Sequence, residues 1–353
     1  MKKIILSTYT FLPDIGGVAT NTLTIAEAFI EKGYDVTVVT STPELCEYDD
    51  QIKIVRSPSS IELFKLYMKA DWILFSNLSV KLCWPVIFMK NKTALHHHSS
   101  SAFNRLKNNG IVSSVKRFIE NKVISKSIHF VNSEFTKKDG GDFFEKLPTY
   151  VSYPIVQNTI IAKHIIDRYS EKKNAIFVGR LEIEKGVLHL LENIEIIKEV
   201  LNVEELTLVG SGSLLRSLQK KNLKGVSYLG AVDLVTVNKL MAESAYVFVP
   251  SIWQEPFGMV AVEGLASGAV VISSDRGGLP EAVGDTGILF DLESEMSFRT
   301  ALQRAKILRD SCLSYNFLSE YTDLANKHMD QFSSDKVIDV IINAINDPDS
   351  KES

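Results

Sequence analysis

The sequence has little of what marks several classes of protein. Its 353 residues include only three cysteines, Cys46, Cys83 and Cys312, which lie far apart, form no CxxC pair and leave an odd number. This pattern argues against a disulfide framework and a thiolate metal site, so a reducing cytoplasm is the simpler interpretation. The formal net charge of -4 excludes the general basic excess that draws proteins to nucleic acid.

Long apolar runs are also missing. The most apolar stretch, CWPVIFM at 83–89, lies between two lysines and is far shorter than the roughly 20 residues that cross a bilayer. The opening MKKIILSTYT has the two lysines of a signal peptide, but Ser7 and Thr8 interrupt its apolar run. We therefore expect a first strand there, and no transmembrane anchor.

What is present is the composition of a globular protein, with 45% hydrophobic and 23% charged residues. Two segments open with the same succession of patterns: IILST, a Gly16-Gly17 turn, a helical pattern and DVTVVTS, and later AIFVG, a loop, a helical pattern over 187–201 and ELTLVGSG. Strand, glycine loop, helix and strand in this order build parallel sheets. The sequence therefore predicts an α/β protein with two Rossmann-like, doubly wound domains.

The predicted boundary lies in the polar segment 160–173, which separates the two patterns. The expected parts are an N-terminal domain over 1–165, a C-terminal domain over 174–335, and a terminal helix with its tail over 336–353; the resemblance described below implies that the first is the acceptor-side domain and the second the nucleotide-sugar-binding domain.

Residues that follow strands are the candidates for function, because ligands bind beyond the carboxyl ends of the strands of a parallel sheet. Gly16 and Gly17, without Cβ atoms, would let backbone N–H groups approach a phosphate, although a glycine pair is also a common plain turn. Arg180 and Lys185 follow AIFVG, and two cations near a helix start suit a diphosphate. The alternative is a solvated loop with surface charges.

The segment WQEPFGMVAVEGLASG at 253–268 follows the predicted strand AYVFVPS. Glu255 falls in the loop, a helix is expected to begin near Gly258, and Glu263 lies about 7 Å further along the helix axis. The N–H groups of Phe257, Gly258 and Met259 would hold an anion between the two carboxylates. One carboxylate would accept from sugar hydroxyls and the other from ribose hydroxyls; the alternative is a helix that merely carries two glutamates.

The three histidines of TALHHHSS end another predicted strand. Consecutive residues of a strand face opposite sides, so His96, His97 and His98 cannot readily converge on one metal ion. One or two buried, hydrogen-bonded imidazoles are the simpler interpretation; the alternative is that one of them faces the ligand cleft. The only DxD spacing, Asp347 and Asp349, is in the tail, so we predict a diphosphate site without a metal.

These residues resemble a known family. VGRLEIEKG at 178–186, EPFGMVAVEGLASG at 255–268 and RGGLPEAVGDTGILF at 276–290 look like the signature of retaining, nucleotide-sugar-dependent glycosyltransferases of family 4, and Glu255 with Glu263 matches its E-x7-E motif. The Gly16-Gly17 pair matches the family's N-terminal glycine loop. The resemblance implies the GT-B fold, two facing Rossmann-like domains with a cleft between them.

The resemblance also implies a role for each matching residue. Arg180 and Lys185 would hold the donor diphosphate, Glu255 would contact the donor sugar, and Glu263 would bind the ribose. The other implied contacts are the backbone of Phe257, Gly258, Met259 and Val260 with the sugar and phosphate, the stretch from Tyr228 to Val232 with the base, and His98, or failing it His96, with the donor sugar.

The implied reaction is retaining transfer of a hexose or N-acetylhexosamine from a UDP- or GDP-sugar to a saccharide or lipid-linked acceptor, without a metal or cofactor. Bacterial relatives use lipid-linked acceptors, which suggests lipopolysaccharide, O-antigen or other cell-surface polysaccharide synthesis. The alternatives are a nucleotide-sugar epimerase, another enzyme of this fold such as a phosphorylase, and a non-catalytic partner subunit of a transferase.

The segment 105–126 carries six basic residues against one acid, Glu120. Apolar residues between those bases can share one helical face, the pattern of a helix that lies on an anionic membrane. This would place the protein at the inner face of the cytoplasmic membrane. An ordinary amphipathic helix packed on the first sheet explains the same pattern.

Overall fold

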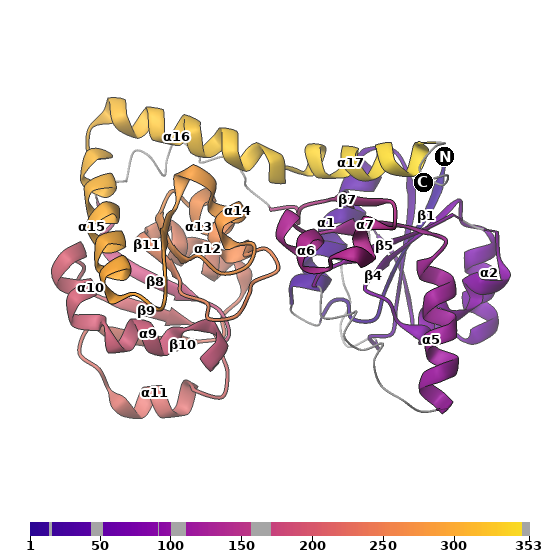
Figure 1. The fold of residues 1–353 in the computed structure, drawn as a ribbon, viewed down its shortest axis with the longest axis horizontal. Helices are drawn as coiled ribbons and strands as arrows, with labels where there is room; N and C mark the ends of the chain where they lie inside the picture. The colour runs from indigo at the N-terminus through magenta and orange to yellow at the C-terminus, as the bar shows by residue number, and fades with distance from the viewer. Residues whose placement is uncertain (14–15, 44–51, 91, 100–110, 157–170, 348–353) are drawn as a thin grey trace. The chain divides into compact units, whose positions relative to one another are not determined.

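The computed structural model describes residues 1–13, 16–43, 52–90, 92–99, 111–156 and 171–347. The chain divides into two compact units, Met1–Ile155 together with Phe332–Ser353, and Val156–Gln331. Each unit is built on its own parallel sheet (Figure 1). The boundary predicted within 160–173 lies mostly outside the described residues and stays a prediction.

The described part of the first unit forms a seven-stranded sheet in the order β3-β2-β1-β4-β5-β6-β7, with every neighbouring pair parallel. Its strands are β1 (Lys3–Thr8), β2 (Asp35–Thr40), β3 (Lys53–Arg56), β4 (Trp72–Ser76), β5 (Lys92–His97), β6 (Ser127–Val131) and β7 (Thr149–Val151). All five residues of β4 are buried, as expected for a parallel strand covered on both faces.

Helices cover both faces of this sheet. They are α1 (Gly17–Glu31), α2 (Ser60–Met68), α3 (Val80–Cys83), the 3-10 helix η1 (Trp84–Phe88), α5 (Ile111–Ile124), α6 (Glu134–Asp139), α7 (Asp142–Glu145) and α17 (Ser334–Asn346). Side chains of β1 alternate between two cores: Ile4 and Leu6 join α1 and α17, whereas Ile5 joins the core of α2, α3, η1 and α5. This period of two sets the register of the sheet.

The C-terminal helix α17 belongs to the first unit although it follows the second in sequence. Its apolar face, which includes Ile338 and Ile341, is buried in the core that α1 shares. Lys32 of α1 forms ion pairs with Asp335 at 2.9 Å and Asp339 at 3.0 Å. Figure 1 shows α17 beside β1 and β7 of this unit.

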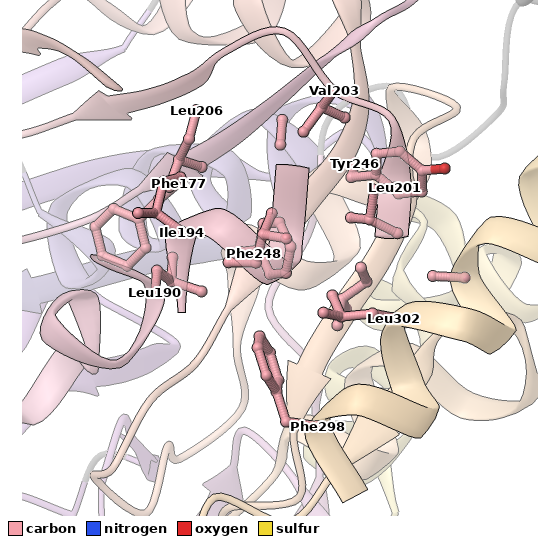
Figure 2. Close-up of a cluster of buried hydrophobic side chains, with 14 of the residues drawn as sticks. Phe177, Leu190, Ile194, Leu201, Val203, Leu206, Tyr246, Phe248, Phe298 and Leu302 are labelled. Carbon is pink, nitrogen blue, oxygen red and sulfur yellow. The ribbon is translucent and has the colours of Figure 1, made fainter. Parts of the chain in front are cut away.

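The second unit has a six-stranded parallel sheet in its described residues, in the order β10-β9-β8-β11-β12-β13. The strands are β8 (Asn174–Val178), β9 (Leu206–Val209), β10 (Val226–Gly230), β11 (Ser244–Val249), β12 (Val270–Ser274) and β13 (Ile288–Phe290). One core, shown in Figure 2, joins Phe177 of β8 and Phe248 of β11 to Phe298 and Leu302.

The α-helices of this unit are α9 (Val187–Glu192), α10 (Ile194–Leu201), α11 (Leu215–Lys221), α12 (Leu234–Glu243), α13 (Met259–Ala266), α14 (Leu279–Val283), α15 (Glu295–Ser311) and α16 (Tyr315–Met329). Its short 3-10 helices are η4 (Ile183–Lys185), η5 (Gly284–Thr286) and η6 (Asp330–Phe332). The last residue of η6, Phe332, already belongs to the first unit. The single helix predicted over 187–201 is wrong in detail. It is broken at Asn193, whose side chain donates to the His189 carbonyl at 2.9 Å and competes with the helical bonds.

The prediction of two Rossmann-like α/β domains is confirmed. In each sheet the chain starts in the middle, at β1 or β8, builds outward to one side, and then crosses to the other side at β4 or β11. Ligands bind at the carboxyl end of the sheet at such a switch point. In the second unit this point lies between β8 and β11.

Candidate active site

Four loops meet at the carboxyl edge of the second sheet. The loop after β11 is joined to the loop after β8, because the N–H groups of Ile252 and Trp253 both donate to the Glu184 carbonyl, at 2.9 and 3.0 Å. The loop after β12 joins them through Gly278, whose N–H donates to the Glu255 carbonyl. The loop after β9 bonds to Leu181 of the β8 loop. Segments that are up to 100 residues apart in sequence therefore form one surface at the switch point.

The structure brings two of the predicted site residues into direct contact. Lys185 Nζ lies 2.6 Å from Glu255 Oε1, and the two side chains are only 22% and 12% exposed. The Ser251 hydroxyl donates to the same Oε1 at 2.5 Å. No described residue donates to the second oxygen, Oε2, which leaves it to accept from a ligand hydroxyl. Sequence reasoning placed both charges near the ligand but did not predict that they pair.

Two glycines hold this ion pair in place. A Cβ on Gly186 would lie 1.8 Å from the Pro250 carbonyl oxygen, and one on Gly277 would lie 2.2 Å from that of Glu255. Their φ angles, +72° and +66°, also fall in the left-handed region that favours glycine. The backbones of the β8 and β12 loops can therefore approach the β11 loop closely only because these residues lack a side chain.

Helix α13 begins where the sequence predicted. Gly258 is its N-cap in the left-handed region, with φ 110°, and Met259 and Val260 start the first turn, where backbone N–H groups have no intrahelical acceptor. The buried Phe257 ring anchors this turn. The helix terminus can therefore hold an anion next to the ion pair, with its dipole adding to the attraction.

Glu263 lies in the second turn of α13. Burial raises the pKa of its carboxyl from 4.5 to about 7. No described residue donates a hydrogen bond to the carboxylate or forms an ion pair with it, so the cost of desolvating the charged form is not offset. Such a group gains from a ligand that donates hydroxyl hydrogen bonds.

Arg180 lies further out than Lys185. Its guanidinium is exposed and pairs with Glu184 at 3.1 Å. Next to it, Glu182 accepts from the backbone and the hydroxyl of Ser213, which ties the loop after β9 to the loop after β8. An exposed arginine at the rim can reach a phosphate but is not held toward one in this state.

The two residues predicted to border a base lie on and just after β10, an edge strand. The Tyr228 ring packs on the core of the unit, and its hydroxyl is buried without a hydrogen-bond partner among the described residues. Val232 follows the strand and is half-buried. A base could therefore contact the backbone of this strand rather than the Tyr228 hydroxyl, and the assignment stays a prediction.

In the first unit, Gly16 and Gly17 form the N-terminus of α1 after β1. Both are exposed, and a Cβ on either would meet no atom within 4 Å. The backbone of both glycines is therefore accessible to a ligand. Their role in binding a phosphate stays a prediction.

The histidines alternate between the two faces of β5, as predicted. The rings of His96 and His98 lie 4.7 Å apart, whereas His97 stacks on His129 and is hydrogen-bonded to it at 2.9 Å. His96 is fully buried between Asn21 and the Ser152 carbonyl, and burial lowers its pKa to about 4. Neither Asn21 nor the Ser152 carbonyl could be predicted as a partner of His96 from the sequence.

His98 is less buried than His96, and its Nε2 atom has no hydrogen-bond partner within the described ranges. Burial and the neighbouring His96 lower the pKa of His98 well below its ordinary value. Of the two histidines considered for the donor, His98 is therefore the one with a ring nitrogen still available. That role remains a prediction.

The basic segment 105–126 is described from residue 111 as helix α5, and residues 105–110 lie outside the described part. The single apolar face expected for it is wrong. Val123 and Ile124 are buried in the core of the first unit, whereas Val115 and Phe118, which lie nearer the N-terminus of the helix, are exposed. The C-terminal half of α5 packs on the domain, and its N-terminal half presents apolar side chains between lysines.

Within the residues that the structure describes, no group of three or more histidine, cysteine or acidic residues is arranged to hold a metal ion. Likewise, none of the described helices has the length and apolar character to cross a membrane.

Comparisons with known proteins show which proteins this chain is similar to. Residues 172–306, which contain the ion pair and α13, match the family model described as "Glycosyl transferases group 1". A protein of Methanocaldococcus jannaschii named as an uncharacterized glycosyltransferase is 36% identical over 118 residues, which are 32% of this chain and 30% of that protein. The chain thus spans about a third of the first curated relatives it matches.

Other comparisons extend over most of the chain. A protein of Klebsiella pneumoniae, named as a 42.6 kDa protein in the cps region, is 26% identical over 80% of this chain and 87% of its own length. The crystal structure of HepE from Anabaena in complex with UDP covers 98% of this chain and 99% of its own, with a TM-score of 0.71 and 16% identity. At that identity the likeness shows the GT-B fold.

Proposed function

We propose that this chain, which belongs to the group 1 glycosyltransferases, transfers a hexose or N-acetylhexosamine from a nucleotide sugar to a saccharide or lipid-linked acceptor with retention of configuration. The observation that carries the proposal is the Lys185–Glu255 ion pair at the switch point of the second sheet, at 2.6 Å and mostly shielded from water. A carboxylate and an ammonium held side by side match a sugar joined to a phosphate.

The donor is held by charge at its diphosphate and by hydroxyl contacts at its two sugars. Lys185 and the N-terminus of α13 attract the diphosphate, and Arg180 turns from Glu184 to it when the donor binds. Glu255 accepts from hydroxyls of the transferred sugar through Oε2, and Glu263 accepts from the ribose. HepE, with the same fold, was crystallised with UDP, which supports a nucleoside diphosphate as the bound part of the donor.

Catalysis then depends on position and electrostatics rather than on a nucleophile and base pair. The leaving diphosphate takes up the proton of the acceptor hydroxyl as that hydroxyl attacks from the same face. Glu255 stabilises the positive charge that develops on the transferred sugar, while Lys185 stabilises the negative charge on the leaving group. Both charges are fixed before the reaction, so little reorganisation is needed.

The reaction needs no metal in this proposal, because Lys185, Arg180 and the helix terminus supply the positive charge. Transfer should therefore continue at an unchanged rate after treatment with EDTA. A loss of activity that Mg²⁺ or Mn²⁺ restores would contradict this part of the proposal.

A lipid-linked acceptor, as in the synthesis of lipopolysaccharide or another cell-surface polysaccharide, is supported by two observations. The relative that matches over most of its length lies in the cps region. In the first unit, Val115 and Phe118 of α5 are exposed, and so are Lys116 and Lys122 on the same helix. Apolar side chains among lysines suit an anionic membrane.

Sedimentation with liposomes tests the membrane contact. The protein should sediment with vesicles of anionic lipid at low salt and should stay in solution with vesicles of neutral lipid. Phe118→Ser should reduce sedimentation several-fold, whereas Tyr315→Ser, which removes an exposed aromatic residue from the second unit, should have no effect. Equal sedimentation of the two variants would contradict the proposal.

An epimerase and a non-catalytic partner subunit are the alternatives. An epimerase would convert a nucleotide sugar without an acceptor, which NMR of the donor alone would detect. A non-catalytic subunit is disfavoured because Glu255, Glu263, Arg180 and Lys185 are all present, and a degenerate copy would be expected to have lost at least one of them.

The direct test of transfer uses variants of the site. Glu255→Gln and Lys185→Ala should each lower the transfer rate by about 100-fold or more, the scale seen when a preorganised charge is removed. Arg180→Ala should reduce it less, because Arg180 lies at the rim. The anomeric configuration of the product, read by NMR, should match that of the donor. Full activity of the Glu255 or Lys185 variant, or an inverted product, would refute the assigned roles.

A further inference from the structure

Three large apolar side chains are exposed at the same edge of the second sheet as the ion pair. They are Ile183 in the loop after β8 and Ile252 and Trp253 in the loop after β11, exposed by 61%, 52% and 47%. We call this set the apolar rim. In contrast, Trp72 in the first sheet is only 5% exposed. What sets the rim apart from other exposed apolar residues of the unit is its place in the two loops that also carry Lys185 and Glu255.

The rim is held in place by its backbone. Ile252 and Trp253 both donate to the carbonyl of Glu184, the residue after Ile183, so the two loops that carry the rim are bonded to each other. At Gly186 the β8 loop also packs closely on Pro250, the residue after β11. Apolar side chains gathered on one surface beside polar groups are a feature of binding sites.

The chemistry next to the rim identifies what it can bind. Trp253 is two residues from Glu255, whose Oε2 is open to a ligand and whose Oε1 is held by Lys185. An indole offers an apolar face, and its N–H is a hydrogen-bond donor. A pyranose ring has the matching parts, with hydroxyls at its edge and C–H groups on its faces. A nucleotide phosphate would use only the hydrogen-bonding groups, and a plain lipid chain would use only the apolar face.

We infer that the apolar rim is a sugar platform, on which a hexopyranose ring stacks against the Trp253 indole while its hydroxyls reach Glu255. This inference rests on the proposed function and adds a residue that determines which saccharide is bound. The ring is that of the donor, because Glu255 accepts from hydroxyls of the transferred sugar in the proposed function.

The nucleobase is the other flat group that could stack on an indole, but it is expected at a different strand. Trp253 follows β11, whereas the predicted base contacts lie at β10, three positions away in the sheet order. At about 4.8 Å between neighbouring strands, the separation is roughly 14 Å. The distance favours a sugar rather than the base at the rim.

Fluorescence tests the platform, because the chain has only three tryptophans. A thermal-shift assay with UDP, GDP and ADP first identifies the nucleotide that stabilises the protein. Quenching is then measured with three ligands: that nucleotide alone, its glucose conjugate, and the nucleotide together with methyl α-D-glucopyranoside. Without ligand, acrylamide should quench Trp253 readily, as judged by the difference between wild type and Trp253→Phe. The nucleotide sugar should reduce that quenching, and the nucleotide alone should not. Protection by the glycoside in the presence of nucleotide, without protection by the nucleotide sugar, would assign the ring to the acceptor and overturn the inference.

Calorimetry gives the size of the effect. Trp253→Ala should weaken binding of the nucleotide sugar by about tenfold, which corresponds to about 1.4 kcal/mol, and should leave binding of the nucleotide unchanged. Trp253→Phe should retain most of the affinity, since it keeps an aromatic face. Tyr315→Ala, at an exposed aromatic residue of α16, is the matched control and should behave as wild type.

The outcomes separate this inference from the proposed function. Unchanged sugar affinity in Trp253→Ala, an equal loss for the nucleotide alone, or a Trp253 that is already shielded without ligand would overturn the platform and leave the proposed function standing. A protein that binds none of the three nucleotides or their sugars would refute the proposed function and the platform together.

Discussion

Replacing Glu263 with glutamine should make the stability of the protein less dependent on pH. The carboxyl lies in the second turn of α13, where burial raises its pKa from 4.5 to about 7, and no described residue donates a hydrogen bond to it. Glutamine has almost the same shape but carries no charge, so the change removes the titration and leaves the packing of the helix nearly as it was.

The sign and the size follow from linkage. The folded protein holds the Glu263 proton more tightly than the unfolded chain does, so the stability that depends on this proton is complete below about pH 4.5 and is lost as the pH rises toward 7. Each pH unit of this interval corresponds to about 1.4 kcal/mol, which limits the loss to about 3 kcal/mol above pH 7. Glu263→Gln should avoid that loss.

Urea unfolding between pH 5 and pH 8 measures the effect. The free energy of unfolding of Glu263→Gln, relative to wild type, should rise by about 1–3 kcal/mol across this range. Glu199→Gln changes an exposed carboxyl on α10 and serves as the control, with no such rise. If the Glu263→Gln and wild-type profiles are parallel, the carboxyl is not buried in the way described.

Nucleotide binding should oppose this effect of burial. Hydroxyls of a ribose that donate to Glu263 favour its charged form, so binding at pH 7 should release up to about half a proton from this group. Calorimetry in buffers of different ionisation enthalpy measures that release, and the difference between wild type and Glu263→Gln isolates it. An identical proton release in both proteins would place the ribose elsewhere.

Three other changes test the packing around the site and the buried histidines. Lys185→Met leaves Glu255 with only the Ser251 hydroxyl and should lower the free energy of unfolding by about 1–3 kcal/mol, a loss that the double variant with Glu255→Gln should partly recover in urea unfolding. Gly186→Ala should destabilise the protein by roughly 3 kcal/mol through its clash and its positive φ, whereas Gly33→Ala, at φ +82° with open space around it, should lose only about 1 kcal/mol. The pKa of His96 falls from 6.5 to about 4 on folding, so its contribution to stability is present above pH 6.5 and is lost as the pH falls toward 4. His96→Asn should therefore make the urea midpoint less dependent on pH between about pH 4 and 6.5.

The second unit could be predicted further than the first because its site lies within short, strongly patterned segments. The strand, loop and helix around Glu255 are continuous in sequence, and the start of α13 follows from Gly258 and the apolar run after it. The two parallel sheets follow from apolar strands that alternate with helices. A local sequence pattern is enough to predict a site when the residues of that site follow a single strand.

The contacts between loops could not be predicted, because they depend on strand order. Nothing in the sequence says that β8 and β11 are neighbours, so the ion pair from Lys185 to Glu255 and the backbone bonds to Glu184 appear only in the folded chain. Likewise, Gly186 in LEIEKG approaches Pro250, which is 64 residues away in sequence. Burial of Glu263 likewise results from packing on several elements.

The helix α5 shows a different limit of sequence reasoning. Apolar residues between bases predicted one face. Val123 is buried and Phe118 is exposed, because side chains five residues apart point about 140° apart around a helix of 3.6 residues per turn. The apolar residues of α5 therefore lie on more than one side of the helix, and one of these sides packs on the domain.

A thermal-shift screen against UDP-, GDP- and ADP-sugars tests the central claim most directly. A ligand that binds the folded state at 100 times its Kd adds about 2.7 kcal/mol to stability, which raises the Tm of a unit of this size by roughly 5–10 °C. One nucleotide class should produce this rise in wild type, and the rise should be largely lost in Lys185→Ala. No shift with any of the three classes, or the same shift in the variant, would contradict a donor site at the Lys185–Glu255 pair.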